Sequence, residues 1–538
     1  LAEHSLVGIE QAIRNIHFPE DDKHLEQARR RLIYQELLIL QAALALRKRS
    51  LGNNFVAPRL ETTALIDARI RDRLPFELTD DQQQAVKEIT ADMDREIPMN
   101  RLLHGEVGSG KTAVAVHAML VAVAGGHQAA VMAPTEILAQ QHMQTLNALL
   151  NPAASNLPSE SASANAPSRV RLTLLTGSLT PAQRRDALAT IAAGETDIIV
   201  GTHSVLSDDV QFTNLALVVI DEQHKFGVRQ RAVLRRASDS EGGKATMPHT
   251  LLMTATPIPR TVTMTLFGDL DLSTIRHAPP GRQEVQSYIV SDPQDGGENS
   301  ADAAGKRAKW WKFFRGKLRS GRQGYVVAPL VDQGNDEVAS VAATFESLSH
   351  GELADFRLDL VHGRMSAAEK QTVMDAFRAG DVDVLIATSV VEVGVDVPNA
   401  TLMTIEDGQR FGLAQLHQLR GRVSRGKHPG MVCVFATTDN SNAVKRLEAF
   451  AKTADGFEIA ELDFALRGPG ELFGTKQHGL PPLRIADLQR DTEVLEETRR
   501  DAAQLVNDES LWQSEDFSRL REMVQRRYGK SLELGDVG

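Results

Sequence analysis

The sequence predicts an α/β protein with two tandem halves, each built around a parallel sheet. Short apolar segments recur along the chain and alternate with longer stretches of helical pattern, as expected for strands buried beneath helices. A Pro-Pro-Gly sequence at 279–281 separates two series of such segments and predicts a linker. The expected strands of the first half lie near 129–133, 171–175, 198–200, 215–220 and 251–254, and those of the second half near 325–328, 357–361, 383–387, 401–405 and 431–435.

Residues 1 to about 60 form a helical flank before the first half. Four apolar residues recur there at heptad spacing and indicate a packed helix; they are Leu25, Leu32, Ile39 and Leu46. Three segments rich in Ser, Ala, Gly, Asn and Asp are predicted to be mobile surface insertions, because their composition does not suit a core. They cover 151–168, 236–248 and 292–305.

A basic stretch from Lys306 to Arg322 carries four interleaved aromatic residues at 310, 311, 313 and 314. Such a stretch can form a stacking platform for nucleic-acid bases. The favoured interpretation is an amphipathic helix with its rings inward and its charges outward, because the stretch leads directly into an expected strand.

The most informative local motif is the stretch 105–112, which fits G-x-x-x-x-G-K-[ST] and predicts a loop that binds nucleoside triphosphate. Its glycines let backbone N–H groups point at phosphate oxygens, and the following helix contributes its positive end. Lys111 is expected to hold the β and γ phosphates, and Thr112 to bind Mg²⁺. The loop contacts are expected from Gly105, Gly108, Ser109 and Gly110. A chance match is the alternative in a chain with 39 glycines, but the strand-loop-helix context favours phosphate binding.

A second acidic motif follows the apolar run at 215–220, where Asp221 and Glu222 stand at the end of an expected buried strand. Carboxyl ends of strands are where parallel sheets place their chemistry. Asp221 is expected to hold Mg²⁺, and Glu222 to orient the attacking water. A solvated strand end or a helix cap is the alternative, which the phosphate loop upstream makes less favoured.

Composition limits the remaining possibilities. The 538 residues, 42% of them hydrophobic, are enough for several cores. The single cysteine, Cys433, excludes an internal disulfide and a multi-cysteine zinc site, and it is expected in the core. No apolar stretch reaches the length needed to cross a bilayer and no signal-peptide pattern opens the chain, so a cytoplasmic protein is expected. The first residue is Leu1 rather than Met, which suggests a fragment.

The net charge of −11 argues against nucleic-acid binding through a globally basic surface, although it is compatible with a local groove. Within the second half, Arg422 and Arg425 lie three residues apart on one face of a helical turn. A guanidinium that reaches across a cleft can neutralise charge on the γ phosphate, as an arginine finger does. A solvated basic helix face is the alternative.

Several of these segments, in this order, resemble the motifs of superfamily-two helicases. They are Pro134-Thr135-Glu136, Gly201-Thr202-His203, the acidic motif at 221–224, Thr254-Ala255-Thr256 and the arginine segment. Longer strings at 221–231, 253–261, 392–401, 411–422 and 467–471 are similar to those of the RecG family of bacterial branched-DNA translocases. The resemblance covers essentially the whole chain. It implies two tandem RecA-like domains at 61–278 and 279–455, a helical remnant at 1–60 after a wedge domain, and a translocation hairpin with the C-terminal region at 456–538.

The resemblance also implies roles for further residues. Phe76 and Gln82 match an adenine-recognition segment, and Gly394 and Asp396 match a loop that senses nucleotide from the second half. Residues that match contacts to the DNA backbone are Thr135, Thr202, His203, His362, Gly363, Arg364, Thr388 and Ser389. Residues that match coupling positions are Thr254 and Thr256 beside the nucleotide, and Arg467 and Gln477 in the translocation loop.

The function that the resemblance implies is an ATP- and Mg²⁺-dependent translocase on double-stranded DNA that remodels stalled forks and Holliday junctions in repair and recombination. The implied protein acts as a monomer near the bacterial nucleoid, with branched DNA and a single-strand-binding protein as partners. A transcription-repair coupling translocase and a non-hydrolysing DNA-binding scaffold are the alternatives. Three residues depart from the family pattern, namely Ser424 between the arginines, and His104 and Glu106 beside the phosphate loop. Family members begin with a wedge domain, and this sequence opens near the expected end of that domain.

Overall fold

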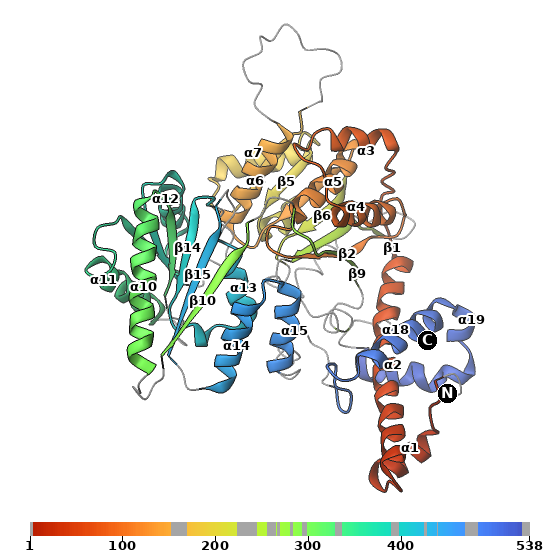
Figure 1. Ribbon diagram of the computed structural model, residues 1–538. Coiled ribbons are helices and arrows are strands. Elements are labelled where there is room, and N and C mark those ends of the chain that lie inside the picture. The colour runs from red at the N-terminus through yellow and green to blue at the C-terminus, as the bar shows by residue number, and fades with distance from the viewer. Residues whose placement is uncertain are drawn as a thin grey trace.

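The two sheets lie side by side, and the helices of the chain termini form a separate group below the first sheet (Figure 1). This computed structural model describes residues 4–151, 169–222, 245–254, 265, 270–279, 283–292, 299–328, 336–388, 397–423, 428–437, 440–467 and 483–529. Both sheets consist of parallel strands, so the expected α/β class with two RecA-like parallel-sheet units is confirmed.

The first sheet has seven strands in the order β4-β5-β3-β6-β8-β2-β9. Alternate residues of its central strands face opposite cores, as the pleat requires: Leu103 and Val131 face one, and Leu102 and Ala130 the other. The strands are β2 (Asn100–Gly105), β3 (Gln128–Met132), β4 (Leu172–Leu175), β5 (Ile198–Gly201), β6 (Leu215–Ile220), β8 (His249–Thr254) and β9 (Asp271–Ile275). The helices of this half are α3 (Ala64–Arg71), α4 (Asp80–Met93), α5 (Lys111–Ala124), α6 (Glu136–Leu150) and α7 (Pro181–Ala192), with the 3-10 turn η1 (His203–Leu206).

The second sheet has six strands in the order β10-β15-β14-β11-β13-β12. Its two cores also divide alternate residues, with Tyr325 on one face and Val326 on the other. The strands are β10 (Val285–Asp292), β11 (Gln323–Val327), β12 (Leu358–Val361), β13 (Val384–Ala387), β14 (Ala400–Ile405) and β15 (Gly430–Thr437). The helices are α10 (Asn299–Arg319), α11 (Asp336–Ser349), α12 (Ala367–Ala379), α13 (Leu413–Arg420), α14 (Ser441–Lys452) and α15 (Gly456–Arg467), with the 3-10 turn η5 (Gly408–Arg410).

The two ends of the described chain pack on each other. Helices α1 (Ile9–His17) and α2 (Asp22–Asn54) stand beside the C-terminal helices in Figure 1. Buried Glu36 of α2 accepts hydrogen bonds from the backbone N–H groups of 484–486 and from the guanidinium of Arg527. The C-terminal elements are α18 (Thr492–Asn507), α19 (Glu509–Trp512), η6 (Glu515–Phe517) and α20 (Ser518–Tyr528). Of the heptad residues, Ile39 and Leu46 are buried, while Leu25 and Leu32 are partly buried.

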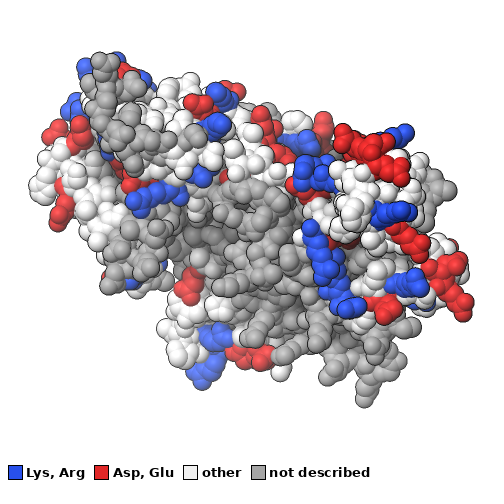
Figure 2. Space-filling model, turned by 90° about the horizontal axis from the view of Figure 1, so that it is seen from below, with Lys and Arg blue, Asp and Glu red and all other residues white. Residues whose placement is uncertain are grey.

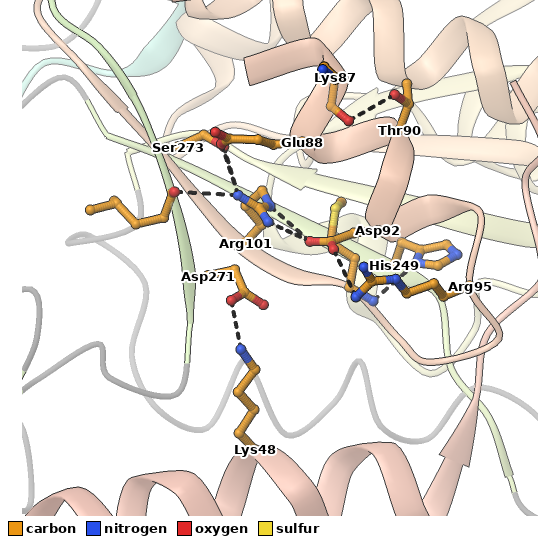
Figure 3. A network of polar contacts seen from close by, with 12 residues as sticks. Lys48, Lys87, Glu88, Thr90, Asp92, Arg95, Arg101, His249, Asp271 and Ser273 are labelled. Carbon is orange, nitrogen blue, oxygen red and sulfur yellow. Dashed lines mark hydrogen bonds and ion pairs between the residues drawn. The ribbon is translucent and has the colours of Figure 1, made fainter. Parts of the chain in front are cut away.

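A polar network fixes the strand that precedes the phosphate loop (Figure 3). Arg101 of β2 donates to Asp92 of α4 at 2.7 Å and to the hydroxyl of Ser273 in β9 at 2.8 Å. Nearby, Lys48 of α2 forms an ion pair with Asp271 at 2.6 Å, which ties the N-terminal helix to the same edge of the sheet. The short strand β1 (Phe55–Val56) adds a second tie by pairing with β7 (Ala245–Thr246).

The structure corrects parts of two expected insertions, 292–305 and 236–248. Within 292–305, strand β10 reaches Asp292 and helix α10 already begins at Asn299, so residues 299–305 are helical. Of the other two segments, 152–168 and 236–244 lie outside the described residues, and 245–246 form β7. Every expected strand is present, together with β1, β7, β9 and β10, which the apolar runs did not predict.

Two expectations about the core are confirmed. The rings of Trp310, Trp311 and Phe314 in α10 are buried, so this stretch is a packing helix, and the indole of Trp310 donates to Thr404. Cys433 is buried in β15, where burial raises the pKa of its thiol to about 12. In the part of the chain that the structure describes, no helix combines the length and the apolar character that crossing a bilayer requires.

Candidate functional site

The sheet order brings three predicted motifs together at the carboxyl ends of the strands of the first sheet. Strand β8 lies between β2 and β6, with His104 opposite Thr254 and Ile220 opposite Leu252. Because these strands are parallel, the phosphate loop, Thr254 and Asp221 follow neighbouring strand ends. The motifs that are far apart in the sequence therefore meet at one site, and buried Thr254 lies between the other two.

The phosphate loop has the backbone that its glycines allow. Gly108 and Gly110 have φ values of 79° and 84°, in the left-handed region that side chains disfavour. A Cβ at Gly110 would also come within 2.2 Å of the Gln82 amide nitrogen. Gly110 is the N-cap of α5, so the loop ends on a helix N-terminus, as anion binding requires.

Lys111 is held inside this loop. Its ammonium donates to the carbonyl oxygens of Gly105 at 2.8 Å and Glu106 at 2.7 Å, and only 8% of the residue is exposed. Thr112 follows at the second position of α5 and is half-buried. The positive charge therefore lies where a phosphate cradled by the loop would meet it.

Asp221 receives a contact that the sequence did not predict. His142 of α6 lies with its Nε2 2.8 Å from one Asp221 oxygen, and the backbone N–H of Glu222 donates to the other at 3.0 Å. Burial alone would raise the pKa of Asp221, but the His142 hydrogen bond and the Lys111 charge outweigh it and lower that pKa below its ordinary value. Asp221 is therefore a carboxylate at neutral pH.

Glu222 has φ 53°, one of three positive φ values among the described residues other than glycine. Such a conformation is costly for a residue with a side chain and is found at functional sites. It turns the backbone at the end of β6, directly after the carboxylate that faces Lys111.

Gln82 contacts the phosphate loop, whereas Phe76 precedes α4 in the sequence. Gln82 is buried at the start of α4, where its side-chain oxygen accepts from Thr79 N–H and its amide donates to the Ser109 carbonyl at 2.9 Å. It therefore ties α4 to the phosphate loop. Phe76 is 46% exposed, so its ring is accessible to a ligand.

The arginine segment of the second half reaches this site. Gly421, the C-cap of α13, packs on the phosphate loop so closely that a Cβ there would lie 2.9 Å from the Cβ of Val107. Arg422 follows immediately and is 92% buried, since 8% of it is exposed. The halves are thus in contact at the place where an arginine finger is needed.

The residues expected to contact DNA in the first half follow two neighbouring strands, β3 and β5. Thr135 caps α6 and accepts from the N–H of Leu138. Thr202 is buried with its hydroxyl 3.2 Å from that of Ser204, while His203 is exposed. These strand ends lie on the far side of β6 from the phosphate loop.

The corresponding residues of the second half follow β12 and β13, which are also neighbours. Gly363 and Arg364 are exposed and His362 is partly buried, and Lys370 donates to the Gly363 carbonyl. Thr388 is 2% exposed, so its hydroxyl is covered in this conformation.

Three family models match consecutive parts of the chain. They are the DEAD/DEAH box helicase at 79–265, the helicase conserved C-terminal domain at 309–427, and the ATP-dependent DNA helicase RecG, domain 3, C-terminal at 453–530. The ATP-dependent DNA helicase RecG of Bacillus subtilis is 40% identical over 519 residues, which are 95% of this chain and 70% of that protein. The chain belongs to the RecG family. The RecG of Synechocystis sp. is 41% identical over 533 residues, covering 98% of this chain and 60% of the relative.

A solved RecG structure agrees with this assignment. The RecG bound to a three-way DNA junction has a TM-score of 0.68 and 38% identity, with 92% of this chain and 61% of that chain covered. The chain thus spans roughly 60–70% of the length of the RecG relatives it matches. The helicase MrfA bound to DNA, at 19% identity and a TM-score of 0.52, shares the fold.

Some residues expected from the RecG resemblance lie outside the described part of the chain. They are Thr256, Ser389, Gly394, Asp396, Ser424, Arg425 and Gln477. Arg467 is the last residue of α15, and its backbone alone is described. Their roles stay predictions.

Proposed function

We propose that this chain is the motor of an ATP-dependent translocase on double-stranded DNA, which remodels stalled forks and Holliday junctions in repair and recombination. The observation that carries the proposal is the contact of Gly421 with Val107, which brings the arginine segment of one half onto the phosphate loop of the other. A cleft closed in this way links nucleotide chemistry to the angle between two domains. Membership in the RecG family supports branched DNA as the substrate.

The phosphates of ATP are the ligand that the loop suits. Backbone N–H groups of 105–110 and the N-terminus of α5 would bind the phosphate oxygens, with Lys111 between the β and γ groups. Phe76 would stack on the adenine, and Gln82 would contact its edge while tying α4 to the loop. Gly394 and Asp396 would contact the nucleotide from the second half.

The residues at this edge also fit Mg²⁺ that arrives with ATP. The described residues contain no group of three His, Cys, Asp or Glu side chains placed to hold a metal by themselves. Mg²⁺ commonly binds through one carboxylate together with substrate phosphates, and Asp221 and Thr112 supply that carboxylate and a hydroxyl. When bound, Mg²⁺ would offset negative charge on the phosphates.

Hydrolysis needs a water molecule in line with the γ phosphorus and positive charge around it. Glu222, turned by its left-handed backbone, would orient and polarise this water. Arg422, together with Arg425, would reach the γ phosphate across the closed cleft. Such arginines add on the order of 10³ to 10⁵ to the turnover of related phosphate-transfer enzymes.

The DNA backbone would be bound by the residues that follow β3 and β5 in one half and β12 and β13 in the other. Hydroxyls, backbone N–H groups and Arg364 suit phosphates and read no sequence. Figure 2 shows Lys and Arg interspersed with Asp and Glu on the described surface of one face, so that described surface is not uniformly basic. The remaining coupling roles fall to Thr254 and Thr256, and to Arg467 and Gln477. Access to Thr388 would require a change in its surroundings.

Two alternatives are less favoured. The relatives from Synechocystis sp. and Bacillus subtilis that match nearly the whole chain are RecG proteins, which argues against a transcription-repair coupling translocase. A non-hydrolysing scaffold would have no need for a charged Asp221 beside a buried Lys111. A monomeric state and a single-strand-binding protein as partner are part of the proposal.

The test is Lys111→Ala, measured by DNA-stimulated ATP hydrolysis. Loss of the ammonium should abolish the activity while the circular dichroism spectrum and Tm stay close to wild type. The control is Lys309→Ala, which removes an exposed lysine of α10. Wild-type turnover in Lys111→Ala would overturn the assignment of the loop.

The substrate is tested by comparing ATPase rates with forked DNA, linear duplex, single-stranded DNA and RNA. Stimulation by duplex and a further gain with forks are expected. Stimulation by RNA or single strands alone would contradict a duplex translocase.

A further inference from the structure

Helix α15 begins against the phosphate loop. Its first N–H groups need acceptors from outside the helix, and Asp455 accepts from Phe457 N–H at 2.8 Å and Glu458 N–H at 3.3 Å. The N–H of Gly456 instead donates to the Glu106 carboxylate at 2.5 Å, across 350 residues of sequence. A side chain of the phosphate loop therefore completes the cap of α15, and its charge suits the positive helix end.

The next residue of α15 packs on the same region. The ring of Phe457 lies edge-on to His104 with 4.8 Å between the ring centres. The Arg276 guanidinium lies 5.6 Å from the centre of the Phe457 ring. His104 is in β2, directly before the loop, and Arg276 directly follows the neighbouring strand β9. The contact thus joins α15 to the two strands at the site edge.

The second half also contacts the turn that leads into α15. Arg420, two residues before Arg422, is 5% exposed and donates to the carbonyls of Phe450, Thr453 and Ala454 at 2.7–3.0 Å. These carbonyls belong to the end of α14 and the turn into α15. The start of α15 is therefore bound to both walls of the nucleotide cleft.

We propose that Glu106 and Phe457 are positioning residues that couple the phosphate loop to α15. The inference rests on the proposed motor function. Lys111 donates to the Glu106 carbonyl, and the Glu106 carboxylate accepts from Gly456, so two hydrogen bonds connect the phosphate-binding lysine to the helix. A phosphate that attracts the Lys111 ammonium would alter the hydrogen bond from Lys111 to the Glu106 carbonyl. This change would shift Glu106 and with it the hydrogen bond between the Glu106 carboxylate and Gly456.

Helix α15 is suited to carry such a movement outward. Its 12 residues form a rod of roughly 18 Å that packs beside α13 and α14 (Figure 1). A small rotation at Gly456 displaces the far end near Arg467 by a larger amount. The contacts at the start of α15 thus determine how much of each nucleotide-dependent movement of the phosphate loop reaches that far end. They involve Glu106, His104, Arg276, Gly456 and Phe457.

The first test compares Glu106→Ala and Phe457→Ala with wild type in the same chain. ATP hydrolysis stimulated by linear duplex is measured beside displacement of a triplex-forming strand from that duplex, and displacement per ATP hydrolysed is the readout. We expect this ratio to fall by about tenfold in both variants, with ATPase largely retained in Phe457→Ala. Phe457→Tyr, which keeps the ring, should restore the ratio, and the control Glu195→Gln, an exposed glutamate before β5, should keep it.

An unchanged ratio in Glu106→Ala and Phe457→Ala would overturn the coupling role. So would an equal loss of ATPase and displacement in Phe457→Ala, because that result means a structural role only. If wild type itself shows no duplex-stimulated ATPase, the proposed function fails, and this outcome is distinct from a failure of the coupling.

The second test needs no DNA. Hydrogen exchange at the backbone amides of 456–459 is measured with and without AMP-PNP and Mg²⁺. We expect the nucleotide to change the protection of these amides in wild type but not in Glu106→Ala, which should also exchange faster at Gly456. Equal responses of wild type and variant to the nucleotide would contradict the proposal.

Discussion

Arg171 in the first half and Arg357 in the second make the same set of contacts. Arg171 donates through its backbone N–H and guanidinium to Asp197, at 2.6–3.2 Å, and to the Gly194 carbonyl at 3.1 Å. Arg357 does so with Asp383, at 2.7–3.1 Å, and with the Gly380 carbonyl at 2.8 Å. Both glycines have positive φ. The two halves therefore repeat one frame, although no short repeat is visible in the sequence.

The correspondence between the two halves extends to strands β3 and β11. Gln128 and Gln323 stand at the starts of β3 and β11. Each side-chain amide donates to one carbonyl near the end of a helix, α7 or α12, and to one just beyond that helix. The neighbouring strands β6 and β14 end in an acidic pair whose second member has positive φ, 53° at Glu222 and 49° at Asp407. The left-handed turn is thus part of the shared frame and does not by itself mark an ATPase.

The two acidic pairs differ in what surrounds them. In the first half, burial raises the pKa of Asp221 less than His142 and Lys111 lower it, so the group is charged. In the second half, burial raises the pKa of Glu406 above its ordinary value despite the Arg307 ion pair at 2.5 Å. The backbone is shared, and the chemistry comes from the side chains that each half brings to it.

The largest expected effect is a difference in ATPase activity between variants of the two acidic pairs, Asp221-Glu222 and Glu406-Asp407. Asp221→Asn should lower DNA-stimulated ATPase by about 100-fold or more, because the carboxylate facing Lys111 is lost. Glu406→Gln should leave the rate nearly unchanged, since Glu406 is paired with Arg307 of α10 rather than with a group of the phosphate loop. Steady-state ATPase of both purified variants checks this. A comparable loss in both would mean that the second pair is part of the machinery.

The next largest effect is expected from His142, which contacts the acidic pair of the first half. In His142→Ala, Asp221 loses the donor that orients it, and the Mg²⁺ concentration for half-maximal ATPase should rise by about tenfold. The measurement is an Mg²⁺ titration of the ATPase at saturating ATP. His350→Ala, which changes an exposed histidine of the second half, is the control. An unchanged Mg²⁺ requirement would show that the His142 contact has no role in holding the ion.

The raised pKa of Glu406 should also make the stability of the protein depend on pH. Its folded pKa is raised, so the folded protein binds the proton more tightly than the unfolded chain, in which the ordinary value is 4.5. This contribution to stability is complete below that value and is lost as the pH rises through the folded pKa. The Tm of Glu406→Gln relative to wild type should therefore increase as the pH rises above 4.5 and through the folded pKa. A difference that stays constant or falls with pH would contradict the raised pKa.

Local motifs predicted most of the fold and part of the site. Central strands are buried on both faces and appear as apolar runs, which is why β3, β6, β8 and β14 were predicted. Strands β9 and β10 each form one edge of their sheet, mix polar with apolar residues, and were missed, whereas the opposite edge strands β4 and β12 were predicted. The start of α10 has the composition of a loop, yet it is helical because the helix is fixed by buried aromatic residues further along.

The site was predictable wherever one segment carries its own chemistry. The phosphate loop and Asp221 follow from short motifs, whereas His142 stands in an ordinary helix and reaches Asp221 only through the fold. The Glu106 contact with Gly456 is equally invisible, because it joins residues on different domains. Contacts between elements depend on the docking of whole domains, which no local pattern encodes.

The smallest expected effect tests the shared frame itself. Arg171→Ala and Arg357→Ala each remove an ion pair whose arginine side chain is more than half exposed, at 52% and 59%. Exposed pairs contribute little, so each variant should lower Tm by only a few degrees, and by the same amount if the halves are equivalent. Arg319→Ala is the control, because the Arg319 guanidinium contacts the Asp355 carboxylate at the long distance of 3.5 Å. A much larger loss for one variant would show that the repeated contacts stabilise the two halves to different degrees, and that the halves share geometry without sharing energetics.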